Sequence, residues 1–453
     1  MRVLVFHGYL LRGTGSNIYN AELAPALARL GHEVHLLSQD REVELPGVHQ
    51  HVPDIGGLLP VYVRDPYDGL EAKTFPELSD GELDRYLEAN VAAVRAVAAG
   101  AGGIDLALAN HLVMGPAILA RAAVAPYAVK VHGSALEYTV KPHSGRFRPY
   151  ALEGVAPARG VLVGSRHTAE SMWEALPDLP ELAEKTRLGP PGVDLEEFVA
   201  AAGRRAPLVV FVGKLIVSKG VDLLLAAWPL VHARHPEARL RVVGFGGWED
   251  AARLLLAALE RGDLDAARDV ARRGRGLEGG EEGPLSILSA FLAAPPHAYA
   301  EQARAAAGSV ELIGRLEHDE VAALLSRAEA LVMPSTFPEA FGMVAVEAGA
   351  AGALPISAGH SGMLEVSRQL AAALPPAVAE LTSFEVGPGA IEAIAARLTA
   401  WFELPEAERE RARAALIETA SRLWNWEGVA RGVLAAASGD LDALPRPVAG
   451  EPG

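Results

Sequence analysis

Short apolar runs alternate along the chain with longer segments rich in alanine, leucine and charged residues. An apolar run of about four to eight residues fits a strand buried on both faces, and the longer segments have helical periodicity. The expected strands fall at 2–6, 33–38, 105–110, 127–133 and 160–165 in the first half, and at 208–213, 239–244, 310–314, 330–335 and 353–358 in the second. This pattern predicts an α/β fold with parallel sheets.

The two groups of strands predict two domains. The stretch TRLGPPGVDLEEF at 186–198 contains a Gly-Pro-Pro-Gly breaker followed by acidic residues typical of a helix start. We place the junction at 188–203, with a first domain at 1–190 and a second at 200–427. Residues 248–309 exceed any ordinary loop, so we expect an insertion that is either a lid or docking surface, or an excursion without a role.

The composition excludes several classes of function. Of the 453 residues, 50% are hydrophobic and 22% are charged, which is enough for packed cores. The formal net charge of −16 argues against a protein that binds nucleic acid by neutralising phosphates. The absence of cysteine excludes disulfides, thiolate metal sites and thiol nucleophiles.

The sequence shows neither a secretion signal nor a membrane span. The N-terminal residues MRVLVFHG fit a strand better than a signal peptide. Charges, glycine or proline interrupt every apolar run before it reaches the roughly 18 residues of a membrane helix. We therefore expect a cytoplasmic protein whose membrane association is at most peripheral.

A glycine-rich turn follows the first expected strand. GTGSN at 13–17 opens a helical run, so its backbone N–H groups and the positive end of the helix dipole favour a phosphate or a sugar. An ordinary glycine turn fits the same residues. A dinucleotide fingerprint fits poorly, because Ile18 stands where a third glycine belongs and Asp40 is the only acid placed to bind a ribose.

Two lysines follow the first strand of the second domain. In FVGKLIVSKG, Lys214 and Lys219 lie in a loop between that strand and a helix. Ligands of α/β domains bind at the carboxyl ends of parallel strands, so both lysines are candidates for binding an anion. Solvated surface lysines are the alternative interpretation.

Two glutamates flank an expected helix start in STFPEAFGMVAVEAGAAG, at 335–352. Glu339 falls in the loop after a strand, and Glu347 lies about one turn into the helix. Between them lie the unpaired donors of a helix start, the N–H groups around Gly342, Met343 and Val344. Carboxylates beside such an anion site would accept hydrogen bonds from hydroxyl groups. A nucleotide-sugar fits this arrangement, whereas the alternative is a loop acid and a helix-dipole partner.

In their order and spacing, these stretches resemble the retaining glycosyltransferases of family 4. The resemblance covers nearly the whole chain apart from 248–309. The matching pieces are GTGSN, RLGHEVHLLS, VHGS, PPGVDLEEF, FVGKLIVSKG, LIGRLEHDEVAALLSRAEALVMPS, PEAFGMVAVEAGAAG and WEGVARGVL. The family implies the GT-B fold, in which two Rossmann-like parallel-sheet domains face each other across a cleft. A C-terminal helix at about 428–445 would pack back on the first domain.

The resemblance implies roles for residues around the donor sugar. Glu339 would contact sugar hydroxyls near the reacting carbon, and Glu347 would hold the ribose. His132, in VHGS, would hydrogen-bond an outer hydroxyl of the sugar. Judged by its residue type alone, a single histidine at this place is more often a satisfied polar core residue.

The resemblance also implies how the rest of the nucleotide is bound. Lys214 and Lys219 would bind the diphosphate, together with the Met343 and Val344 N–H groups and Gly15 of the N-terminal loop, while Arg315 and Leu316 would border the base. The family usually has arginine where Lys214 stands, and lysine offers a point charge in place of a bidentate fork.

The implied reaction is glycosyl transfer with retention at the anomeric carbon. The donor would be a UDP-, GDP- or ADP-linked sugar, no metal is implied, and the lysines and amides would stabilise the charge of the leaving diphosphate. Two Asp-Leu-Asp stretches, 263–265 and 440–442, follow no apolar strand and read as helix-start acids.

The acceptor, a small molecule or a glycan, is expected to bind the first domain, at the stretches 58–78 and 132–150. Its candidate contacts are Tyr67, Asp68, Asn110, His111, Glu137, Tyr138 and Lys141. Basic residues at 141–148 would favour an acidic acceptor or an anionic membrane surface.

Other functions fit parts of the same pattern. A glycoside hydrolase also uses two carboxylates, but it needs neither the lysines nor the helix-start donors. A sugar-nucleotide epimerase or a phosphorylase of the same architecture, and a sensor that binds nucleotide-sugars without turnover, are further alternatives.

Overall fold

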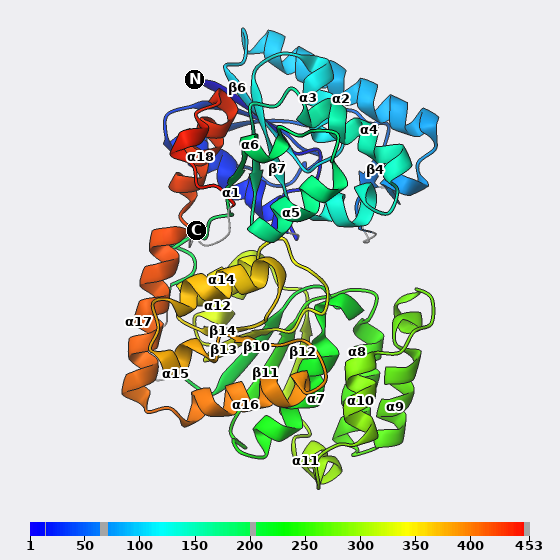
Figure 1. Ribbon diagram of the computed structural model, residues 1–453, viewed down its shortest axis with the longest axis vertical. Coiled ribbons are helices and arrows are strands. Elements are labelled where there is room, and N and C mark those ends of the chain that lie inside the picture. The colour runs from blue at the N-terminus through cyan, green and yellow to red at the C-terminus, as the bar shows by residue number, and fades with distance from the viewer. Residues whose placement is uncertain (14, 64–70, 200–204, 448–453) are drawn as a thin grey trace. The chain divides into compact units, whose positions relative to one another are not determined.

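The computed structural model describes residues 1–13, 15–63, 71–199 and 205–447. The chain forms two compact units, of which unit 1 comprises residues 1–192 and the segment from Trp424 onward, and unit 2 comprises Val193–Leu423. Each unit is built around its own sheet (Figure 1). The α/β architecture predicted from the apolar runs is confirmed for both units.

Unit 1 contains a seven-stranded sheet in which every pair of neighbours is parallel. In spatial order its strands are β3 (Val48–His51), β2 (Glu33–Leu37), β1 (Arg2–Phe6), β6 (Leu106–Asn110), β7 (Tyr127–Val131), β8 (Gly160–Val163) and β9 (Thr186–Leu188). The central strands are buried along their whole length, as expected for a sheet covered on both faces. A separate pair is formed by β4 (Leu58–Val61) and β5 (Glu71–Thr74).

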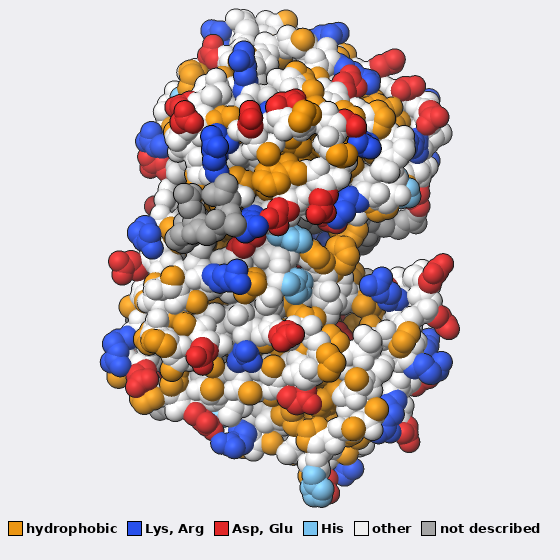
Figure 2. All heavy atoms as spheres, in the orientation of Figure 1, with side chains coloured by type: hydrophobic (Ala, Val, Ile, Leu, Met, Phe, Trp, Pro, Cys, Tyr) orange, Lys and Arg blue, Asp and Glu red, His pale blue; other side chains and the backbone are white. Residues whose placement is uncertain are grey.

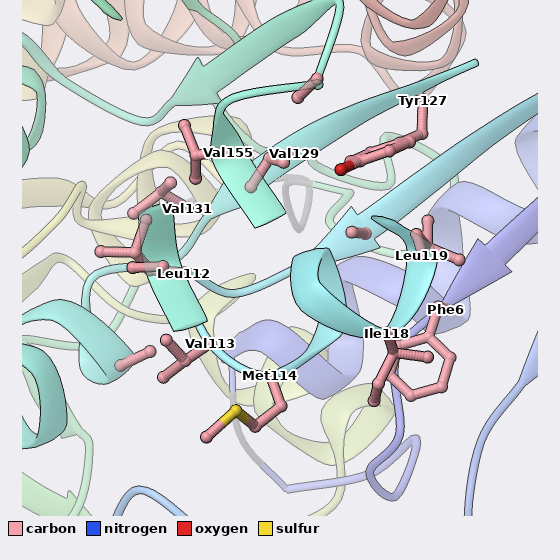
Figure 3. Packing of buried hydrophobic residues seen from close by; sticks show 14 of the residues in the cluster. Phe6, Leu112, Val113, Met114, Ile118, Leu119, Tyr127, Val129, Val131 and Val155 are labelled. Atoms are coloured by element: carbon pink, nitrogen blue, oxygen red, sulfur yellow. The ribbon is translucent and has the colours of Figure 1, made fainter. Parts of the chain in front are cut away.

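Helices form two hydrophobic cores with this sheet. The larger core contains α2 (Asp80–Gly100), α3 (Gly115–Ala122), α4 (Ser144–Val155), α5 (Arg166–Ala175) and α6 (Leu182–Lys185). Figure 3 shows buried side chains of this core from β1, β7, α3 and α4. The second core contains α1 (Gly15–Arg29) and α18 (Trp426–Ser438), which pack on each other. The end of the chain therefore completes the core of unit 1.

Unit 2 contains a six-stranded parallel sheet. In spatial order its strands are β12 (Val310–Gly314), β11 (Arg239–Val243), β10 (Leu208–Val212), β13 (Ala330–Met333), β14 (Leu354–Ala358) and β15 (Ser383–Phe384). Its main helices are α7 (Val221–His232), α12 (His318–Leu325), α13 (Met343–Ala350), α14 (Ser361–Ala371), α15 (Pro376–Ala379), α16 (Ala390–Glu403) and α17 (Glu406–Leu423). A buried ion pair joins Arg413 of α17 to both oxygens of Glu329, each at 2.7 Å.

The long segment after β11 folds as a group of helices. These are α8 (Glu249–Glu260), α9 (Leu264–Arg273), α10 (Ser286–Ala293) and α11 (Tyr299–Ala305). Helices α8, α10 and α11 contact α7, and α9 packs on α8 and α10 (Figure 1). Tyr299 donates a hydrogen bond from its hydroxyl to the Ala226 carbonyl of α7 at 2.7 Å. The insertion at 248–309 is thus packed onto the body of unit 2.

The structure corrects several local predictions. All ten expected strands are present, but β3, β4, β5, β9 and β15 were not predicted. These strands are short or only partly buried, so they lack a long apolar run. The acidic stretch after Val193 forms a turn where a helix start was expected, because the Asp194 carboxylate accepts hydrogen bonds from the Glu196 and Glu197 N–H groups. The C-terminal helix ends at Ser438, where Gly439 adopts a φ of 89°.

Candidate active site

The strongest candidate residues of unit 2 lie where its strands end. Glu339 follows β13, Lys219 ends the short 3-10 helix η3 (Val217–Lys219) after β10, and Glu347 lies in α13. The carboxyl ends of neighbouring parallel strands share one edge of the sheet, which is where α/β domains bind ligands.

Lys219 and Glu339 form a direct ion pair between Nζ and Oε1. The Lys219 and Glu339 side chains are 28% and 22% exposed, so the ion pair is partly buried but still accessible to solvent. Burial would raise the pKa of Glu339, but the Lys219 charge and the hydrogen bonds from Lys219 and Ser335 hold it below its usual value. The sequence analysis gave these residues separate ligand contacts, whereas in the structure they neutralise each other.

A set of short hydrogen bonds fixes the position of Glu339. The Ser335 hydroxyl donates to Oε1 at 2.8 Å, and the Glu339 backbone N–H donates to the Ser361 hydroxyl at 3.0 Å. His360 Nε2 lies 2.9 Å from the Ser335 carbonyl, so this nitrogen carries the proton. Its Nδ1, 3.2 Å from the Ser361 hydroxyl, is then the acceptor. Hydrogen bonds to both the side chain and the backbone of Glu339 therefore fix the position of its carboxylate.

The lysine loop, residues 213–220, packs tightly against the end of β13. Gly220 has a φ of 68°, and a Cβ at this position would lie 2.0 Å from the Pro334 carbonyl oxygen. Only glycine fits both the backbone conformation and the space. Lys214 and Lys219 are the only lysines between residues 193 and 423, where every other strongly basic residue is arginine. Unit 2 thus uses compact ammonium groups only in this loop.

The start of α13 has the geometry expected of an anion site. Gly342 precedes the helix with a φ of 138°, and Met343 and Val344 are its first two residues. N–H groups in the first turn of a helix have no acceptor within that helix. Both residues are half-buried, and such a helix start is a favourable place for an anion.

Glu347 is bound to a histidine that sequence reasoning missed. The side chain of Glu347 is 8% exposed, and its Oε1 lies 3.2 Å from His318 Nε2. His318 Nδ1 lies 2.9 Å from Oε2 of Glu197. Burial would lower the pKa of His318, but the hydrogen bonds and charges of Glu197 and Glu347 outweigh it and raise that pKa to about 10. His318 is therefore an imidazolium that bridges two carboxylates.

Arg315 and Leu316 follow β12 at the same edge of the sheet. The Arg315 guanidinium lies 5.6 Å from the centre of the Phe245 ring and 3.1 Å from Oε1 of Glu317. Arg315 is exposed and Leu316 is half-buried, so they present a cationic and an apolar surface next to the site.

In unit 1, His132 ends a hydrogen-bonded chain of buried amides. Its Nε2 lies 2.8 Å from Asn110 Oδ1, while Asn110 Nδ2 donates to Asn20 Oδ1 at 2.7 Å. Since Asn110 Oδ1 can only accept, His132 carries its proton on Nε2 and leaves Nδ1 as an acceptor. Burial first, and then the charges of His111 and Lys130, lower the pKa of His132 well below its usual value. His132 is thus a neutral, oriented imidazole.

The chain of amides continues to the glycine-rich turn. Asn20 Nδ2 lies 3.1 Å from His7 Nδ1 and donates to the Ser16 carbonyl at 2.8 Å. His7 Nε2 lies 3.0 Å from Asn17 Oδ1. Gly15 opens α1, the helix that carries Asn17 and Asn20. The start of α1 is thus linked to His132 through Asn20 of α1 and Asn110 of β6.

Two buried groups lie beside His132, namely His111, an acceptor candidate from the sequence, and Lys130, which the sequence did not single out. His111, at 2% exposure with a φ of 67°, has no hydrogen-bond partner for either ring nitrogen among the described residues. Lys130 donates to the Gly189 carbonyl at 2.6 Å and lies over the Tyr19 ring, and burial lowers its pKa to about 7. The His111 and His132 rings lie 4.9 Å apart, so an unpaired imidazole borders the oriented one.

The other acceptor candidates differ in their contacts and exposure. Glu137 and Lys141 pair with each other at 2.8 Å, and Tyr138 is exposed. Tyr67 and Asp68 lie outside the described residues. The remaining basic residues of the 141–148 stretch are also occupied, with Arg146 on Asp80 and Arg148 on Asp178. These ion pairs offset part of the positive charge of the stretch, and an acidic acceptor or an anionic membrane surface stays a prediction.

The site residues that the sequence analysis missed could have been found from their positions relative to the strands. Ser335 lies two residues after β13, and His360 and Ser361 lie two and three residues after β14, at the edge of the sheet where α/β domains bind ligands. His318 begins the helix after β12. Three contacts of these residues, His318–Glu347, Glu339–Ser361 and His360–Ser335, join positions 22 to 29 residues apart, so they could not be read from local spacing. Only the Ser335–Glu339 contact is local, at four residues.

Three features concern the described part of the chain as a whole. No group of three or more metal-ligating side chains is found among them, and Asp263 caps α9 by accepting from the Ala266 N–H at 3.0 Å. None of their helices is both long and apolar enough to span a bilayer. On the face drawn in Figure 2, Lys and Arg are interspersed with Asp and Glu.

Comparisons with known families agree with this geometry. A model of Glycosyltransferase Family 4 matches residues 13–197. Two models described as Glycosyl transferases group 1 match residues 206–270 and 298–420. The chain therefore belongs with the GT-B glycosyltransferases of the family-4 type.

Similar proteins point to the same fold. The chain is 28% identical over 274 residues to a glycogen synthase of Mycobacterium tuberculosis, which covers 59% of this chain and 52% of that protein. It thus spans about half the length of the curated relatives it matches. Sucrose-phosphate synthase from Thermosynechococcus elongatus is 20% identical with a TM-score of 0.62, covering 98% of this chain and 99% of that one. HepE from Anabaena, solved with UDP-glucose, is 16% identical with a TM-score of 0.61, covering 97% and 99%.

Proposed function

We propose that the chain transfers a sugar from a nucleoside-diphosphate sugar to an acceptor hydroxyl, with retention of the anomeric configuration. The observation that carries this proposal is the Lys219–Glu339 ion pair at the strand ends of unit 2. A cation for a phosphate and a carboxylate for hydroxyl groups are thereby placed side by side, next to the free N–H groups of a helix start.

Donor binding would exchange partners within the site. The diphosphate binds Lys219 and Lys214 on one side and accepts hydrogen bonds from the Met343 and Val344 N–H groups on the other. The sugar hydroxyls donate hydrogen bonds to Glu339. As the bond from the anomeric carbon to the phosphate oxygen breaks, negative charge accumulates on that oxygen. Preorganised cations and amides stabilise this charge without a metal.

The remaining contacts of the donor follow from the residues around this pair. Glu347, already held by His318, accepts the ribose hydroxyls, and Arg315 with Leu316 borders the base. From unit 1, the neutral His132 accepts a sugar hydroxyl at Nδ1, and Gly15 of the glycine-rich turn meets the diphosphate. The acceptor hydroxyl attacks the anomeric carbon from the face of the departing phosphate, an oxygen of which takes the hydroxyl proton, so that the configuration is retained.

The donor class is proposed from the site and from relatives. HepE was solved with UDP-glucose, and starch synthase IV from Arabidopsis thaliana was solved with ADP and acarbose. We propose a UDP-, ADP- or GDP-linked hexose as donor and a small molecule or glycan as acceptor. Cytoplasmic location, inferred from the sequence, is part of the same proposal.

A thermal-shift screen of UDP, ADP, GDP and their hexose conjugates tests the donor assignment. Binding of a nucleoside diphosphate at a hundred-fold excess over its Kd should stabilise the folded chain by about 2.7 kcal/mol. The conjugate of the stabilising nucleotide is then incubated with acceptor sugars and glycans. Isomerisation of the donor alone would identify an epimerase, and sugar release without a nucleotide would identify a hydrolase.

The site assignment is tested by two variants and one control. Glu339→Gln should reduce transfer by at least about a hundred-fold, because oriented charge stabilisation is worth several kcal/mol. Lys219→Ala should act similarly. Glu380→Gln removes an exposed carboxylate of the same unit and should leave turnover unchanged. Full activity of either site variant, with unaltered donor binding, would refute the assignment.

A further inference from the structure

The lysine loop is held by the segment that enters the insertion. The Leu215 N–H donates to the Phe245 carbonyl, and the Trp248 N–H donates to the Leu215 carbonyl, both at 2.8 Å. Gly246 has a φ of 152°, and a Cβ there would lie 2.5 Å from the Leu215 carbonyl oxygen. The loop between the two lysines and the entry to the insertion therefore touch through their backbones.

A second contact comes from deep within the insertion. Glu278, in the 3-10 helix η4 (Arg275–Glu278), accepts a hydrogen bond from the Val217 backbone N–H at 2.8 Å. Trp248, which is 1% exposed, donates a hydrogen bond from Nε1 to the carbonyl of Gly274, the residue before η4, at 3.3 Å. This bond helps to hold η4 next to the lysine loop. The donor and acceptor lie 61 residues apart in the chain. The carboxylate thus fixes the backbone of the loop two residues before Lys219.

Glu278 belongs to a part of the chain that the family models do not describe. The matched regions end at residue 270 and resume at residue 298. The contact with Val217 is therefore a feature of this chain that the family match does not assign. A half-buried carboxylate bound to a backbone N–H makes a charge-assisted hydrogen bond, which is stronger than a neutral one.

We propose that Glu278 is a positioning residue for the diphosphate of the donor. Glu278 binds the Val217 N–H and so fixes the backbone of the turn that carries Lys219. Glu339 binds the ammonium group at the other end of the Lys219 side chain. The insertion thereby forms the outer support of the phosphate-binding loop. This inference rests on the proposed function, because it assigns the lysines to a diphosphate.

The test compares three variants of the full chain. Glu278→Ala removes the acceptor, Glu278→Gln keeps a carbonyl oxygen for Val217 but removes the charge, and Glu281→Ala removes an exposed carboxylate of the same insertion. Affinities for UDP, ADP and GDP, and for the three monophosphates, are measured by calorimetry. Melting temperatures without ligand report on folding.

For the nucleotide that the wild type binds, Glu278→Ala should weaken diphosphate affinity at least about ten-fold, while Glu278→Gln should recover most of it. The monophosphate should lose much less, because it makes fewer contacts with the loop. Equal losses for both nucleotides, or a Glu278→Ala affinity equal to that of Glu281→Ala, would overturn the inference. If the wild type bound none of the diphosphates, the proposed function itself would fail.

Discussion

The imidazolium of His318 gives a prediction whose magnitude follows from the structure. Its pKa is raised to about 10 because it lies between Glu197 and Glu347, against 6.5 for an unperturbed histidine. The folded state therefore binds this proton more tightly than the unfolded state. The resulting stabilisation is fully present below a pH of about 6.5 and is lost as the pH rises toward about 10.

The size of the effect follows from the difference between the two pKa values. Each pKa unit corresponds to about 1.4 kcal/mol, so the full contribution has an upper bound of about 5 kcal/mol. Because the His318 side chain is 23% exposed, solvent screening reduces this figure. We expect about 2 to 3 kcal/mol of stability to be lost between about pH 6 and pH 9 through this group.

The variant His318→Gln isolates the contribution. Denaturant unfolding of wild type and variant at several pH values should show a stability difference that shrinks as the pH rises, since both carboxylates stay ionised throughout this range. In NMR spectra, the histidine resonance missing from the variant should keep the shift of a charged ring through about pH 8. A titration midpoint near 6.5, or a pH-independent stability difference, would refute the bridging imidazolium.

Three further predictions follow from other contacts. Arg413→Met leaves the buried Glu329 carboxylate without its main partner and should cost about 3 to 5 kcal/mol of unfolding free energy in chemical denaturation. Gly220→Ala places a Cβ 2.0 Å from a carbonyl oxygen, so it should lower the melting temperature and weaken nucleoside-diphosphate binding in calorimetry; an unchanged affinity would contradict the tight loop packing. Asn110→Ala removes the acceptor that orients His132 and should reduce kcat about ten-fold with a smaller change in the Kd of the nucleoside diphosphate, measured by steady-state kinetics and calorimetry.

The placement of the candidate residues of unit 2 was largely predictable because they lie close together in the sequence. Glu339, Gly342 and Glu347 lie within nine residues around one helix start, and Lys214 and Lys219 share one loop. A strand followed by a loop and a helix fixes which end of the sheet such residues occupy. The pairing within the site was not predictable, since Lys219 and Glu339 are 120 residues apart in the chain.

The sequence by itself determined the alternation of strands and helices in both halves and ten of the fifteen strands that the described residues form, because buried parallel strands require continuous apolar runs that the chain displays. It also placed the candidate acids, lysines and glycines at the ends of those strands. Only the tertiary structure decided how their charges are arranged: Lys219 on Glu339, His318 between two glutamates, and Glu278 on the lysine loop. These contacts join residues 29 to 121 positions apart, and hydrogen bonds depend on distances of a few ångströms that no local pattern encodes.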